Sequence, residues 1–209
     1  MSNLESLINR VLCGDCTQVM KRLPDESIDL VLTDPPYLAN YHDRTGRTVR
    51  GDREGSWLYP AFLEAYRVLK RDRFCISFYG WPQADKFLRA WKAVGFRPVG
   101  HVVFVKQYAS RTGYLEARHE AAYLLAKGVP AEPYSPISDV RPWQYTGNKL
   151  HPTQKPESAL VPLIRAFSRP GDVVLDPFAG SGSTCRAARK VGRRFIGIEL
   201  ERGYISEAA

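Results

Sequence analysis

The chain has 209 residues, 44% of them hydrophobic, and it carries a formal net charge of +8 with a pI near 9.4. This size allows one domain with an ordinary buried core and argues against two. The basic balance favours a polyanionic partner, nucleic acid first. There is no basic leader followed by an apolar stretch, and no run approaches the roughly 20 apolar residues that span a bilayer. We therefore expect a soluble, cytoplasmic protein without membrane contact.

Short apolar runs alternate with helical patterns along the chain, which predicts an α/β domain with a mostly parallel sheet. The expected strands are residues 10–13, 28–33, 74–80, 101–106, 121–126, 172–176 and 193–199. The expected helices are residues 57–70, 82–94, 156–167 and 183–191. Polar stretches at 38–56 and 128–150 interrupt the alternation, and loops of this length tend to be functional or mobile. No repeat divides the chain, so residues 1–209 are predicted to form a single domain.

The four cysteines include a C-x-x-C pair, Cys13 and Cys16. Zinc would need two more ligands at similar spacing, and Cys75 and Cys185 each stand alone. We interpret all four as small buried thiols and expect no metal site.

A glycine-rich turn follows the apolar run that ends at Asp176. Gly180 and Gly182 let the backbone turn sharply and approach a ligand closely. The next strand ends on Glu199, where nucleotide-binding folds place an acid for ribose hydroxyls. The turn lies late in the chain and lacks the G-x-G-x-x-G spacing, which argues against a dinucleotide oxidoreductase.

Carboxylates stand at the ends of four expected strands. Placing the strands in the spatial order 172–176, 193–199, 10–13 and 28–33 puts all four acids on one sheet edge, where such folds bind ligands. These acids are Asp176, Glu199, Asp15 and Asp34. Core packing does not explain them, so we interpret the edge as a binding site.

The strand at 28–33 runs into Asp34, Pro35, Pro36 and Tyr37. Each proline fixes φ and lacks an N–H, so a carbonyl in this segment is rigid and free of a sheet ladder. Asp34 adds a carboxylate beside that carbonyl and Tyr37 adds a flat ring. Two acceptors and a stacking surface suit a planar aromatic amine, whose lone pair they would direct at an electrophile.

These motifs resemble those of S-adenosylmethionine-dependent DNA amino-methyltransferases of the permuted beta class. The matching segments are "DPPY" (34–37), "HPTQKP" (151–156) and "DPFAGSGST" (176–184). The resemblance covers nearly the whole chain. It implies a Rossmann-like methyltransferase fold with a circularly permuted motif order, and a seven-stranded, mostly parallel sheet with one antiparallel strand. The strands near 101–108 and 119–128 are plausible partners in its hairpin.

The resemblance also implies residue roles. Asp34, Pro35, Pro36 and Tyr37 would hold a target base flipped out of double-stranded DNA. Cofactor contacts would come from Asp15, Asp34, His151, Thr153, Lys155, Asp176, Phe178, Ala179, Gly180, Ser181, Gly182, Ser183, Thr184 and Glu199. An edge-strand role and a base-pocket role are equally open for His119 and Glu120.

The candidate DNA readers lie in the two polar stretches. We treat 38–56 as a mobile active-site and DNA loop and 128–150 as a short target-recognition segment. Their DNA-contacting candidates are Arg44, Arg47, Arg50, Arg53, Arg141, Trp143 and Lys149. Because few side chains are available to contact base edges, we expect either a short target sequence or relaxed sequence specificity.

The resemblance implies methylation of the adenine 6-amino group as the favoured activity, because Asp rather than Ser at the start of the P-P-Y motif points to adenine in this family. The alternatives are the cytosine 4-amino group, an RNA amine, and a catalytically silent DNA-binding relative. The resemblance further suggests a homodimer and a solitary, bacterial or phage-encoded enzyme.

Overall fold

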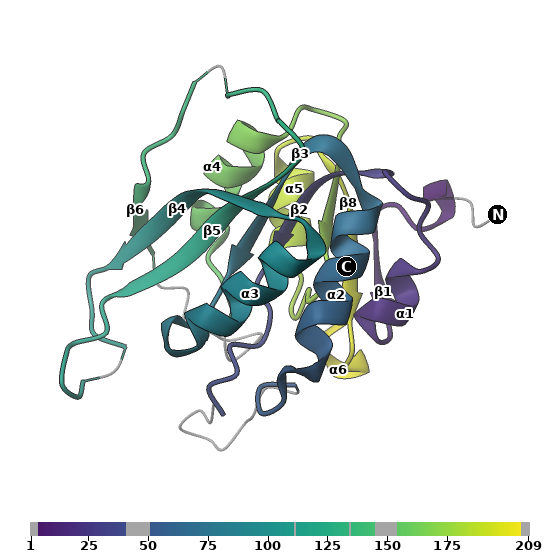
Figure 1. Ribbon diagram of the computed structural model, residues 1–209. Helices are drawn as coiled ribbons and strands as arrows, with labels where there is room; N and C mark the ends of the chain where they lie inside the picture. Colours follow the sequence, from purple (N-terminus) through teal and green to yellow (C-terminus); the bar gives the residue numbers. More distant parts are fainter. Residues whose placement is uncertain (1–3, 41–50, 111, 134, 145–153, 206–209) are drawn as a thin grey trace.

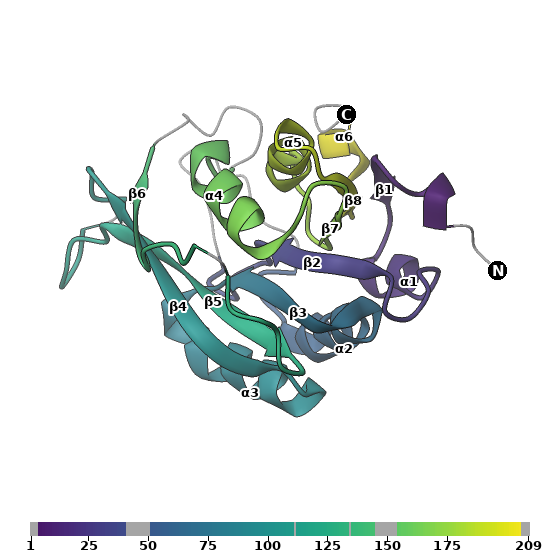
Figure 2. The ribbon, with the colours of Figure 1, turned by 90° about the horizontal axis from the view of Figure 1, so that it is seen from above.

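The computed structural model describes residues 4–40, 51–110, 112–133, 135–144 and 154–205. They form a layered domain with a sheet between two groups of helices (Figures 1 and 2). The strands are β1 (Arg10–Cys13), β2 (Ile28–Thr33), β3 (Leu69–Phe78), β4 (Arg97–Lys106), β5 (His119–Lys127), β6 (Val140–Trp143), β7 (Val173–Asp176) and β8 (Arg194–Glu199). The α-helices are α1 (Cys16–Met20), α2 (Leu58–Val68), α3 (Ala84–Val94), α4 (Glu157–Phe167), α5 (Ser183–Lys190) and α6 (Arg202–Ile205). Short 3-10 helices are η1 (Leu4–Ser6), η2 (Gly55–Trp57) and η3 (Trp81–Gln83).

The sheet has the strand order β1-β8-β7-β2-β3-β5-β4-β6. All neighbours pair in parallel except at β5, which runs antiparallel to both β3 and β4. The predicted α/β fold, the single antiparallel strand and the hairpin that contains it are therefore confirmed.

The expected count of seven strands is wrong for the described residues, because β6 adds an eighth beside β4. This strand lies inside the segment that we treated as a recognition loop. It was missed because it is four residues long and contains Pro142, and its four side chains give no clean apolar alternation. Proline is tolerated there because β6 is an edge strand.

The predicted order of the first strands also needs correction. β2 lies between β7 and β3, and not beyond β1. All six residues of β2 are buried, as expected of a central parallel strand covered on both faces. Hydropathy alone does not say which buried strands are neighbours.

Helices cover both faces of this sheet. In the view from above, α1, α2 and α3 lie on one side and α4 and α5 on the other (Figure 2). Val31 joins the core under the first group, whereas Leu30 and Leu32 join the core under the second. Alternate side chains of one strand thus anchor both layers. Helix α2 stops at Val68, two residues earlier than expected, because Leu69 begins β3.

Across these described ranges, no helix is long and apolar enough to cross a membrane. All four cysteines are free thiols. Cys16, Cys75 and Cys185 are buried as expected, but Cys13 is exposed at the end of the edge strand β1. Among the residues described, no group of three or more His, Cys, Asp or Glu could hold a metal ion.

Candidate active site

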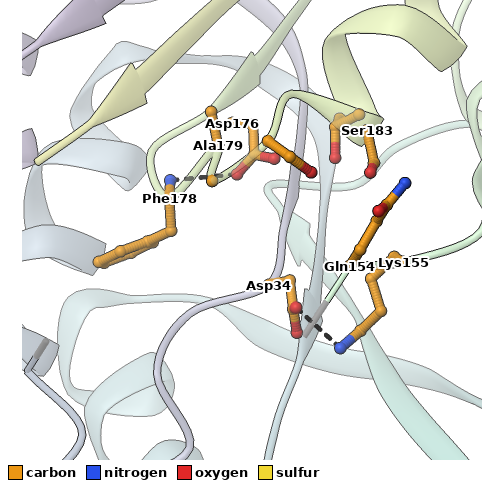
Figure 3. A pocket seen from close by; sticks show the side chains of 10 residues that line it. Asp34, Gln154, Lys155, Asp176, Phe178, Ala179 and Ser183 are labelled. Carbon is orange, nitrogen blue, oxygen red and sulfur yellow. Dashed lines mark hydrogen bonds and ion pairs between the residues drawn. The ribbon is translucent and has the colours of Figure 1, made fainter. Parts of the chain in front are cut away.

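The carboxyl ends of β1, β8, β7 and β2 meet along one sheet edge, because these neighbouring strands are parallel. Asp15, Glu199, Asp176 and Asp34 stand at or just after those ends, so their predicted common edge is confirmed. A cavity that is open to solvent lies there (Figure 3). It is lined by Asp34, Gln154, Lys155, Asp176, Phe178, Ala179, Gly180, Ser181, Ser183 and Thr184.

Asp34 pairs with a buried lysine. A dashed line joins the two side chains in Figure 3: Oδ2 of Asp34 lies 2.7 Å from Nζ of Lys155, while Oδ1 is buried without a hydrogen-bond partner. Burial raises the pKa of the Asp34 carboxyl, and Lys155 opposes this shift by favouring the charged form. The Lys155 ammonium also lies 5.0 Å from the ring centre of Tyr37 and 5.2 Å from that of Phe78. A buried acceptor thus has one oxygen free for a donor.

Tyr37 is held at both ends. Its hydroxyl donates to Oε2 of Glu120 at 3.3 Å. At the other end it packs against Gly80, where an added Cβ would lie 2.8 Å from the Tyr37 Cβ and 3.0 Å from its carbonyl oxygen. Burial, followed by the nearby carboxylates of Asp34 and Glu120, raises the pKa of Tyr37 well above its ordinary value. The phenol is therefore a neutral donor.

Asp176 is a buried acid at the end of β7. Its Oδ1 accepts hydrogen bonds from the Thr33 hydroxyl at 2.9 Å and from the Phe178 N–H at 3.1 Å. Burial nevertheless raises the pKa of this carboxyl to about 7. A cation that entered the site would favour the charged form of this carboxyl.

The glycine loop turns at Gly180 and Gly182, whose φ values are +51° and +79°. These left-handed conformations explain the need for glycine at both positions. Glu199 closes the loop from the neighbouring strand, because its Oε2 accepts the Gly180 N–H at 2.8 Å. Its Oε1 accepts the N–H of Glu201 at 2.7 Å, and burial raises the pKa of this carboxyl.

Asp15 is exposed and caps α1 by accepting the N–H groups of Thr17 at 2.9 Å and Gln18 at 3.2 Å. The pKa of Asp15 is lowered, chiefly by its hydrogen bond from the Thr17 hydroxyl. In the structure this side chain therefore acts as the N-cap of the helix.

A family model described as DNA methylase, of the N6/N4 type, matches residues 28–209. The Escherichia coli (strain K12) protein named "Putative methylase YubD" is 54% identical over 197 residues, covering 94% of this chain and 87% of that protein. The chain belongs to the N6/N4 DNA methylase family. The resemblance inferred from its motifs is therefore confirmed.

A second relative of this methylase, the DNA adenine methyltransferase YhdJ of the same strain, is 31% identical over 235 residues, with 93% and 79% coverage. Two solved structures share the fold. The M1.HpyAVI–SAM complex has a TM-score of 0.76 at 21% identity, covering 95% of this chain and 96% of that one. The cytosine-N4-specific PvuII DNA methyltransferase has a TM-score of 0.78 at 18% identity, with 96% and 86% coverage.

Sequence reasoning did not find every residue that the methylase gathers at this edge. The Trp57 ring lies edge-on to Phe178, with 4.9 Å between ring centres, and its Nε1 donates to the Gly51 carbonyl at 2.9 Å. The role of Glu120 was left open, and it now lies beside Tyr37. A carboxylate at the start of an apolar strand was the available signal, but it does not indicate which way the side chain points.

The expected DNA readers of the methylase divide into three groups. Trp143 is a correction, because it is buried and packs edge-on to Phe104 with 5.9 Å between ring centres. Arg53 is exposed and donates to Asn40 Oδ1 at 2.7 Å, and Arg141 is half-buried on β6. Arg44, Arg47, Arg50 and Lys149 lie outside the described residues, as do His151 and Thr153 from the expected cofactor set.

Proposed function

We propose that this methylase transfers a methyl group from S-adenosylmethionine to the exocyclic 6-amino group of adenine in DNA. The observation that carries the proposal is Asp34 Oδ1, a buried carboxylate oxygen without a hydrogen bond at the rim of the cavity. A buried acceptor in this state is costly unless a donor arrives. An exocyclic amine is such a donor.

The chemistry of the cavity fits the cofactor. Asp176 would accept the ammonium of its methionine part, and the backbone of the loop from Phe178 to Thr184 would enclose that part. Glu199 would accept the ribose hydroxyls, while Asp15, His151, Thr153 and Lys155 would complete the pocket. When bound, the cofactor supplies an electrophilic methyl group on a sulfonium.

Asp34 and the adjoining proline segment would hold the target amine. The free Asp34 oxygen would accept one N–H, and the Pro35 carbonyl would accept the other. These acceptors favour the form of the amine whose lone pair points out of the base plane. The Tyr37 ring would stack on the base, which must leave the duplex to reach this edge. The contribution of these groups is positioning and preorganised electrostatics.

The transfer forms a bond from the amine nitrogen to the methyl carbon and breaks the bond from sulfur to that carbon. The nitrogen then gives up one proton. Asp34 is the base within reach of it, and burial raises the pKa of this carboxyl, which strengthens it as a proton acceptor.

The deciding experiment incubates the protein with labelled cofactor and unmethylated DNA, and then separates the nucleosides. Label in N6-methyladenine supports the proposal, and the 31% identity to an adenine methyltransferase favours that outcome. Label in N4-methylcytosine would show that the target base is cytosine and not adenine, with the same residues holding the amine and the cofactor. Label in RNA alone, or none in DNA, contradicts the proposal.

A matched pair of variants tests the role of Asp34. Asp29 is also buried and is paired with Lys70 at 2.6 Å, but it stands near the start of β2, whereas Asp34 follows the end of that strand. We expect Asp34→Asn to lower turnover by roughly 10²–10³-fold, the cost of removing one preorganised group. Asp29→Asn should lower stability and leave the turnover of folded protein unchanged.

Arg44, Arg47, Arg50, Arg53, Arg141 and Lys149 are the proposed DNA contacts. We also propose a cytoplasmic homodimer, because one chain of 23.6 kDa offers little surface to a duplex. Light scattering at micromolar concentration, with and without DNA, tests the assembly. A mass of one chain under both conditions would contradict it.

A further inference from the structure

The orientation of Tyr37 depends on two charged residues from the other half of the sheet. Glu120 lies at the start of β5 and bonds the Tyr37 hydroxyl through Oε2. Its second oxygen, Oε1, accepts a hydrogen bond from Nζ of Lys106, at the end of β4. Lys106 also donates to the Ser110 hydroxyl at 3.2 Å. A chain of contacts thus runs from the β4–β5 hairpin to the Pro-Pro-Tyr segment.

The topology explains why these residues meet. β5 is antiparallel, so its first residues lie at the edge where the parallel strands end. Phe78, the last residue of β3, pairs with Ala122, two positions after Glu120. Gly80 lies two residues after Phe78 and packs against the Cβ and carbonyl of Tyr37. The ring is consequently fixed by Gly80 at its root and by Glu120 at its hydroxyl.

The ion pair in this chain is buried. The side chains of Lys106 and Glu120 are 5% and 20% exposed. Burial raises the pKa of Glu120, but the ammonium groups of Lys155 and Lys106 and the Tyr37 hydroxyl together lower it below its ordinary value. Glu120 is therefore ionised and a strong acceptor. A buried ion pair is usually no more stabilising than apolar residues of similar size, so stability alone does not explain it.

We propose that Glu120, held by Lys106, is a positioning residue that fixes the direction of the Tyr37 side chain and so the place of its ring for the target base. This inference rests on the proposed function, since Tyr37 is useful as a stacking surface only if a base enters. Glu120 acts through Tyr37 and needs no contact with the base or the cofactor.

The test combines Tyr37→Phe, Glu120→Gln and the double variant. Tyr37→Phe keeps the ring and removes only the hydroxyl, which interacts with both Glu120 and Asp34, and Glu120→Gln changes the Glu120 side of this arrangement alone. We expect each single variant to lower kcat by roughly 10-fold, in line with the loss of one hydrogen bond to a charged group. The double variant should be no worse than the poorer single one, because Tyr37→Phe removes this contact and Glu120→Gln weakens the same one by replacing its charged acceptor with a neutral amide. Calorimetry should give unchanged cofactor affinity in all three.

Two further variants separate positioning from general damage. Glu64→Gln removes a carboxylate from the Arg67 ion pair on α2, so it tests the same chemical change away from this edge and should keep full turnover. Lys106→Met should lower kcat as Glu120→Gln does, because Glu120 loses its anchor. A 2-aminopurine probe at the target position should report a less ordered extruded base in Tyr37→Phe and Glu120→Gln, which a loss of stability elsewhere would not produce.

The outcomes are distinguishable from failure of the proposed function. If the wild-type protein methylates DNA and Asp34→Asn does not, the function stands. Unchanged kcat in Glu120→Gln would then overturn the positioning role by itself. Losses that multiply in the double variant would overturn it as well, because they would show that Glu120 acts independently of Tyr37.

Discussion

Lys155 Nζ and Asp34 Oδ2 lie 2.7 Å apart in a buried ion pair, and the second oxygen of Asp34 has no hydrogen bond. The side chains are only 8% and 17% exposed. Lys155 is therefore the group that favours the charged form of this buried acid against the effect of burial. The motif that contains it was expected to serve the cofactor alone, whereas its ammonium also touches the residue proposed to hold the base.

This pair predicts a change in pH dependence. The pKa of Asp34 is raised by burial and lowered by Lys155, so Lys155→Met should raise it further. Turnover needs the ionised form and falls as pH drops through this pKa. The acidic limb of the pH–kcat profile should therefore move to higher pH in Lys155→Met. Lys70→Met, which breaks the matched pair with Asp29, should not move it. An acidic limb unchanged in Lys155→Met would contradict the assignment.

Asp176 predicts a pH-dependent stability. Its folded pKa of about 7 exceeds the ordinary value of 3.8, so the folded state binds the proton more tightly than the unfolded state. Its contribution to stability is present at low pH and is lost as pH rises from about 4 to about 7. Asp176→Asn removes this loss. In urea unfolding, the free energy of unfolding of the variant should rise relative to that of the wild type by up to ~1.4 kcal/mol per pH unit in this window. Above the window the difference should stay constant. A constant difference within the window would refute the shifted pKa.

The close contact at Gly80 predicts that one added methyl group will lower both stability and methylation. A Cβ there would lie 2.8 Å from the Tyr37 Cβ and 3.0 Å from its carbonyl oxygen, so the Pro-Pro-Tyr backbone must shift. We expect Gly80→Ala to lower stability by about 1–3 kcal/mol and to reduce methylation further than that loss of folded protein explains. Gly203→Ala on α6, where an added Cβ meets no atom within 4 Å, should do neither. Wild-type turnover in Gly80→Ala would show that this contact does not orient Tyr37.

Glu199 predicts a loss confined to cofactor binding. Its carboxylate closes the glycine loop by accepting the Gly180 N–H, and its proposed role is to accept the ribose hydroxyls of the cofactor. Glu199→Ala should weaken S-adenosylmethionine binding by roughly 1.5–3 kcal/mol, the range for hydrogen bonds to a charged group. Glu201→Gln changes an exposed acid two residues away and is the control. Titration calorimetry without DNA makes the comparison, and equal affinities would rule out the assigned role.

Because few side chains of this protein are candidates for base contacts, we expect a short target sequence in DNA. Each good bidentate base contact discriminates by roughly 1–3 kcal/mol, so a few arginines can specify about two to four base pairs. DNA binding should fall steeply as salt rises, because phosphate contacts dominate affinity. Modification mapping on a methylation-free genome checks the first expectation and titration at several salt concentrations the second. Methylation confined to one site of six or more base pairs would contradict the short target.

The sequence by itself predicted the α/β class, the glycine loop and the shared edge of Asp34, Asp176 and Glu199. These follow from local rules, because a parallel strand places the residue after it at a known edge and positive φ selects glycine. The sequence did not predict the eighth strand or the place of β2 in the sheet. Which strands pair depends on contacts between residues far apart in the chain, and hydropathy does not record them.

Only the tertiary structure decided how the charged side chains pair. Lys155 meets Asp34 across 121 positions of the chain, and Glu120 meets Tyr37 across 83. Trp143 was expected to contact DNA because of its residue type and its place in a polar segment. In the structure it is buried and packs against Phe104. The direction of a side chain at a strand end depends on the register of that strand with its neighbours, and register is a property of the assembled sheet.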